Sequence, residues 1–170
     1  MNELPYYSIP GCPDEVSATN TIARFIDGLG FRYRWATEGL TENEMTFRPE
    51  KGSKNMIELL NHIYDLAYRT SHTFGETVSA DKRPETFSEL RENTLVLYFD
   101  LSSRLKEMDD TALIAAKTNG RMINNQPVFW YFMNGPIADA LTHVGQITSW
   151  RRIAGNPQPK GVNVFFGTGK

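Results

Sequence analysis

The stretch that decides the fold runs from Asn134 to Pro157 and reads NGPIADALTHVGQITSWRRIAGNP. Its apolar residues recur at helical spacing, its first residue is a candidate N-cap, and Pro136 can occupy the first helical turn. Arg151 and Arg152 suit the C-terminal end of a helix dipole, and Gly155 stands where a helix end favours glycine. The stretch therefore predicts a helix, with a kink or restart at its beginning, that ends just before Gly155.

Two residues of this helix can act as metal ligands. Asp139 and His143 lie four residues apart, so their side chains leave one helix face a turn apart. A carboxylate and an imidazole so placed can hold a divalent cation if another ligand comes from elsewhere. Other interpretations stay open: Asp139 could form a salt bridge or complement the helix dipole, and His143 could be a hydrogen-bonded packing residue.

Three further segments have the apolar period of a helix and a residue that can cap the start. They run from Asp14 to about 38, from Ser53 or Asn55 to about 76, and from Thr86 to about 109. Four helices in one chain of 170 residues predict an all-α protein, a four-helix bundle in a single domain over residues 1–170. Before the last helix, Asn119-Gly120 is typical of a short hairpin turn or an ordered loop, and residues 128–133 are expected to be helical and largely buried.

His62 is the candidate third ligand. A helical wheel places His62 at the edge of the apolar face of the second predicted helix, and His143 takes the equivalent position on the last. Neighbouring helices can therefore direct both imidazoles into one cleft. His72, ten residues further on, lies off that face and is interpreted as a surface or packing histidine. Glu58, four residues before His62, is either a fourth ligand or, more typically, a solvated charge.

Gln146 lies close to His143 on the same predicted helix and has two interpretations. Its amide either hydrogen-bonds a ligand or a metal-bound water, or it is a packing amide. Trp130, Tyr131 and Trp150 would wall the cleft, although core packing explains these aromatic residues equally well.

The composition excludes several classes of protein. Acidic and basic residues nearly cancel, 20 against 18, so no basic excess indicates a nucleic-acid partner or an anionic membrane surface. Cys12 is the only cysteine, which excludes an intrachain disulfide and a multi-cysteine zinc site, and its surroundings suit an inert thiol. No window has the apolar length of a membrane span. We expect a soluble cytoplasmic protein, and the aromatic content is compatible with a homodimer.

Two stretches resemble the DinB/YfiT-like metalloenzyme family. Residues 40–62, LTENEMTFRPEKGSKNMIELLNH, are similar to its passage from the first helix through an R/W-x-P loop to the first histidine of the second helix. Residues 142–155, THVGQITSWRRIAG, are similar to its final-helix H-x-G-Q-I pattern with the arginines and glycine that follow. The resemblance implies a four-helix bundle with one divalent ion, often zinc or nickel, bound by a histidine of the second helix and an H-x-x-x-H pair on the last.

The chain departs from the family at one ligand. His62 and His143 match the first and third positions, but Asp139 stands where the family usually has a histidine. The carboxylate keeps a metal-competent oxygen and shifts the preference towards iron, manganese or magnesium.

The family's familiar activities are thiol-dependent transferases and isomerases, in which the metal lowers the pKa of a low-molecular-weight thiol by binding its thiolate. The resemblance thus implies a metal-dependent enzyme of the thiol-transferase or hydrolase kind with a small-molecule substrate. A facial-triad iron enzyme is less favoured, because such triads are usually built on β-barrels. The alternative from another class is a non-catalytic helical bundle whose metal site is degenerate or empty, acting in binding or stress response.

Overall fold

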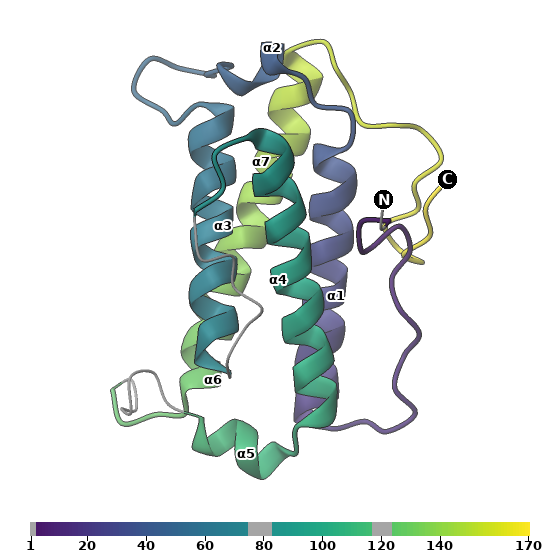
Figure 1. Ribbon diagram of the computed structural model, residues 1–170, viewed down its shortest axis with the longest axis vertical. Helices are drawn as coiled ribbons and strands as arrows, with labels where there is room; N and C mark the ends of the chain where they lie inside the picture. The colour runs from purple at the N-terminus through teal and green to yellow at the C-terminus, as the bar shows by residue number, and fades with distance from the viewer. Residues whose placement is uncertain (1–2, 75–82, 117–123) are drawn as a thin grey trace.

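The computed structural model describes residues 3–74, 83–116 and 124–170, and within these ranges every regular element is helical (Figure 1). The long helices are α1 (Ala18–Thr37), α3 (Met56–Thr73), α4 (Phe87–Glu107) and α7 (Ala138–Ile153). The short ones are α2 (Glu42–Met45), α5 (Asp110–Ala115), α6 (Val128–Phe132) and the π-helical turn η1 (Met133–Ile137). An isolated antiparallel bridge joins Asn163 to Thr168. The all-α prediction is confirmed.

The four long helices lie side by side along the long dimension of the molecule (Figure 1). α1 packs against α4 and α7, and α3 packs against the same two helices. Arg151 near the end of α7 contacts the carbonyl of Ala36 near the end of α1, and Arg104 near the end of α4 contacts Ser71 near the end of α3. α1 and α7 therefore run in one direction, and α3 and α4 run together. Arg91 near the start of α4 contacts Thr37 at the end of α1, so the two pairs are antiparallel.

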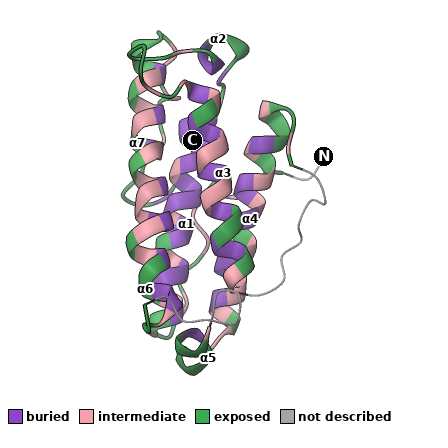
Figure 2. Ribbon diagram, turned by 90° about the vertical axis from the view of Figure 1, so that its left-hand side faces the viewer, coloured by how far each residue is buried: buried purple, intermediate pink, exposed green. Residues whose placement is uncertain are grey.

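The core lies between these helices, where the buried faces meet (Figure 2). On α3 the predicted apolar face is confirmed, because the residues in the helical pattern are all at most 1% exposed: Met56, Leu59, Leu60, Ile63 and Ala67. Burial of these side chains is what orients α3, and it leaves His62 at the edge of the buried face, partly exposed. Across the described ranges, no helix combines the length and apolarity needed to cross a membrane.

Side-chain caps set most helix starts. Thr86 caps α4 as predicted, and Asn55, one of the two candidates, caps α3; each forms a capping box with the glutamate three residues on. The predicted cap of α1 at Asp14 is wrong, because Ser17 accepts the hydrogen bond from the N–H of Asn20 and the helix begins at residue 18. The predicted end of α3 near residue 76 and the turn at Asn119-Gly120 lie outside the described residues.

The last helix does not restart at Asn134. α6, η1 and α7 are continuous, and the chain passes through a π-helical turn that contains Pro136. Proline has no N–H to donate to an α-helical ladder, and π-helix occurs mostly as single turns inside α-helices, as it does here between α6 and α7. Residues 128–133 are helical, but Trp130 and Tyr131 are 58% and 50% exposed, so the expectation of a largely buried segment is wrong for these two.

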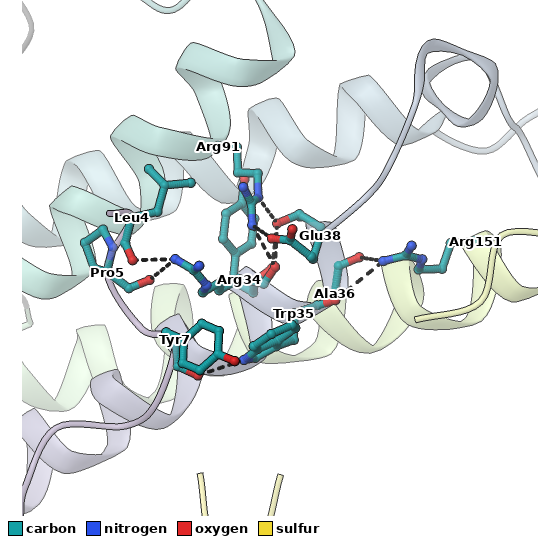
Figure 3. Close-up of polar contacts among 11 residues, drawn as sticks. Leu4, Pro5, Tyr7, Arg34, Trp35, Ala36, Glu38, Arg91 and Arg151 are labelled. Atoms are coloured by element: carbon teal, nitrogen blue, oxygen red, sulfur yellow. Dashed lines mark hydrogen bonds and ion pairs between the residues drawn. The ribbon is translucent and has the colours of Figure 1, made fainter. Parts of the chain in front are cut away.

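Three arginines hold the C-terminal end of α1 (Figure 3). Arg91 donates from Nε to the hydroxyl of Thr37 at 2.9 Å, and Arg151 donates from Nη1 to the carbonyl of Ala36 at 2.8 Å. Arg34 reaches back to carbonyls of the N-terminal segment. The last carbonyls of a helix have no hydrogen-bond donor within that helix. Guanidinium groups from α4 and α7 supply such donors at the C-terminal end of α1.

Candidate metal centre

The crossing of α3 and α7 brings the three predicted ligands together. His62 comes from α3, and Asp139 and His143 come from consecutive turns of α7. One ligand atom from each residue lies within 4.8 Å of the others. This group could hold a metal ion, and it is the set proposed from the sequence.

The carboxylate of Asp139 lies between the two imidazoles. Its Oδ2 is 3.0 Å from Nε2 of His62, and its Oδ1 is 3.3 Å from Nε2 of His143. The two rings are 4.9 Å apart and nearly perpendicular, at 78°. Each carboxylate oxygen thus faces one imidazole nitrogen.

Two simpler interpretations of Asp139 were open: that its charge complements the helix dipole, and that it forms a salt bridge. Because α6 and η1 precede α7 without a break, Asp139 lies well inside a continuous helix and not at a free N-terminus, so dipole complementation loses its basis. An ion pair remains, but its partners are the histidines: within the described part of the chain, no Lys or Arg forms a salt bridge with Asp139.

Gln146 fixes the orientation of His143. Its Oε1 lies 2.8 Å from Nδ1 of the imidazole. An amide oxygen only accepts, so this contact favours the tautomer with the proton on Nδ1, in which Nε2 presents its lone pair towards the carboxylate of Asp139. Two electron-rich atoms then face each other at 3.3 Å. Either a proton on Nε2 or a cation between the two atoms satisfies both, and the donor set therefore fits a divalent ion.

The site is accessible. The side chains of His62, Asp139 and His143 are 33%, 45% and 16% exposed. Three protein ligands with an exposed side are the pattern of catalytic rather than structural metal sites, because further positions stay available to water or a substrate.

Other side chains considered from the sequence lie elsewhere. Glu58 caps α3 and pairs with Arg48 at 3.2 Å, and the hydrogen bond from the N–H of Asn55 lowers the pKa of its carboxyl. His72 is exposed and its ring stacks on Tyr68 at 3.9 Å, as a surface or packing histidine would. Glu58 therefore has a capping role that explains its position without a metal.

A groove that the sequence did not reveal begins at Asp139. It has a volume of about 950 Å³ and lies between α3 and the continuous helix formed by α6, η1 and α7. Tyr131 lines this groove and, with Trp130, a second hollow, whereas Trp150 packs near Phe47, with ring centroids 6.4 Å apart. One sequence signal could have indicated this groove. Arg69 follows His62 by seven residues and therefore lies on the same face of the helix.

Comparison of the chain with family models, with curated proteins and with solved structures found no match. The argument for function therefore depends on the geometry and chemistry of the site.

Proposed function

We propose that this chain is a divalent-metal-binding enzyme built on a four-helix bundle of the DinB/YfiT-like type. The observation that carries the proposal is the convergence of His62, Asp139 and His143 from two helices into one partly exposed group. The mutual packing of the four long helices supports the bundle architecture. The reaction class that we propose is metal-dependent thiol transfer or hydrolysis on a small molecule.

Each residue has a defined task in this proposal. Nε2 of each imidazole and one oxygen of Asp139 bind the ion, and Gln146 holds the proton on Nδ1 of His143 so that Nε2 stays available. A bound ion would supply Lewis acidity and lower the pKa of a coordinated water or thiol. The resemblance favours zinc or nickel, and the carboxylate brings iron or manganese into range.

Metal uptake tests the ligand assignment. We expect the purified chain to bind one ion when titrated with Zn²⁺, Ni²⁺, Mn²⁺ or anaerobic Fe²⁺, measured by calorimetry and by elemental analysis after gel filtration. His62→Ala and His143→Ala should each lose stoichiometric binding, because two ligands on a partly exposed site hold an ion poorly. His72→Ala, which removes an exposed imidazole outside the group, should bind as the wild type does. Unchanged metal content in the first two variants would refute the assignment.

Turnover separates the enzyme from the non-catalytic alternative. With a panel of small thiols and a chromogenic electrophile, we expect metal-dependent thiol transfer that chelation abolishes and the added ion restores. The observation that favours the alternative is that each oxygen of Asp139 already lies within 3.3 Å of an imidazole nitrogen, so N–H donors alone could satisfy the carboxylate without any metal. A wild type that takes up none of the four ions would support that alternative.

A further inference from the structure

The groove beside the candidate metal centre has the dimensions of a ligand site. Its volume of about 950 Å³ is at the upper end of the range for small-molecule pockets. Ala138, Asp139 and Thr142 of α7 line one part of it, and the rest of the lining comes from α3 and the segment from α6 to η1. This segment and the lower half of α3 lie together at one end of the molecule (Figure 1).

The wall formed by α3 carries a basic group at a fixed distance from the metal centre. Leu66, Arg69 and Thr73 line the groove and follow His62 at intervals of four, three and four residues, which places all four on one helical face. Arg69 is exposed, and no other described residue forms an ion pair with its guanidinium. Seven residues of helix separate Arg69 from His62 by about 10 Å along the axis.

The opposite wall is aromatic and open. Tyr131 and Phe132 line it, with Tyr131 half exposed. The π-helical turn follows, and a Cβ built on Gly135 would meet nothing within 4 Å. The backbone at this glycine therefore borders free space, and π-helical turns inside α-helices are frequent at functional sites.

The charges of the lining favour a negatively charged ligand. Among the described residues that line the groove, Asp139 is the acidic side chain, and Arg69 and His72, both on α3, are the basic ones. A divalent ion on Asp139 would more than neutralise the carboxylate, so both ends of the loaded groove would be positive. The middle offers an aromatic and apolar surface.

We propose that this groove binds small organic anions with an aromatic or apolar body, and that Arg69 binds the anionic group about 10 Å from the metal centre. The proposal rests on the proposed function for the ion at Asp139, and it names the substrate class of that site. The body of the ligand packs against Tyr131 and Phe132, and the end remote from the anionic group reaches the metal.

Calorimetric titration with 2-naphthoate, and with neutral 2-naphthamide for comparison, tests this inference in metal-free and in zinc-loaded protein. In the metal-free protein we expect 2-naphthoate to bind more tightly than the amide. Arg69→Gln should weaken binding of 2-naphthoate about fivefold, the effect of one exposed charge pair. Arg152→Gln, which removes an exposed arginine from the far end of α7, should leave binding unchanged.

A second pair of variants tests the groove by shape. Gly135→Leu should block 2-naphthoate, because the added side chain enters the open groove without meeting protein atoms. Gly145→Leu, at an exposed helical glycine that is equally unobstructed and does not line the groove, is the matched control and should bind normally.

The two proposals fail in different ways. If zinc binds but Arg69→Gln and Gly135→Leu have no effect on 2-naphthoate, the inference about the groove is wrong and the metal site stands. The same conclusion follows if 2-naphthoate binds only in the presence of zinc and is insensitive to Arg69, because the carboxylate would then be on the ion. If 2-naphthoate binds as expected but no ion is taken up, the groove stands and the proposed enzyme does not.

Discussion

Asp139→Asn is expected to weaken binding of a divalent ion by more than about a hundredfold. Loss of a residue that only hydrogen-bonds a metal ligand typically weakens binding about 10- to 100-fold, and loss of a ligand itself should cost more. The carboxylate lies between His62 and His143 and contacts both, and asparagine keeps its shape while removing its charge and one of its two oxygens. The side chain is 45% exposed, so the fold should tolerate the change. Calorimetry with Zn²⁺ and Mn²⁺, alongside a thermal unfolding curve, measures both effects.

Asp139→His is the informative partner of this variant. It produces the three-histidine set of the family that the sequence resembles, and imidazole is a softer ligand than carboxylate. We expect it to retain zinc and to lose relative affinity for Mn²⁺. If Asp139→Asn bound both ions as tightly as the wild type, the carboxylate would not be a ligand and the metal proposal would fail at its centre.

Arg151→Met is expected to lower the free energy of unfolding by about 3 kcal/mol, because each buried carbonyl that loses its donor costs about 1–3 kcal/mol. Arg151 is 1% exposed and donates to the carbonyls of Trp35, Ala36 and Asn156 and to the side chain of Asn156. Removal from water lowers the pKa of its guanidinium, an effect that the charges of Glu44 and Glu38 oppose. Methionine of similar length would leave these carbonyls without a partner.

Urea unfolding followed by circular dichroism measures this loss. Arg152→Met is the matched control, because the neighbouring arginine is exposed and surface substitutions usually change stability by about 0.5 kcal/mol or less. A loss below about 1 kcal/mol for Arg151→Met would show that water replaces the guanidinium at these carbonyls, and that this contact does not hold α7 to α1.

Much of the helical fold could be predicted because apolar period and caps are local signals. The face of α3 from Met56 to Ala67 is buried as its spacing predicts, and the capping boxes at Asn55 and Thr86 start their helices. α5 was missed because a single short helix of six residues has no period to detect. The π-turn at Pro136 could not be told from the sequence, because the same residues suit either a kink or a new helix start.

The positions of the two histidines could be predicted, because the apolar face of each helix determines where they lie. His62 and His143 stand at the edges of two buried faces, and packing of those faces brings them together. The groove was not predictable, because its walls belong to helices that meet only in three dimensions. Tyr131 belongs to an unbroken aromatic run, which has no polar face to mark exposure.

The position of the candidate ligands on two helices has a consequence for the whole molecule. His62 and Asp139 are 77 residues apart in the chain, so an ion shared between them would join α3 to α7 as a reversible cross-link. A ligand that binds only the folded state adds its binding free energy to stability, about 2.7 kcal/mol when the free ion is a hundred times its dissociation constant. The melting temperature of the protein would then rise with the concentration of the free ion, and the stability of the whole bundle would report metal availability.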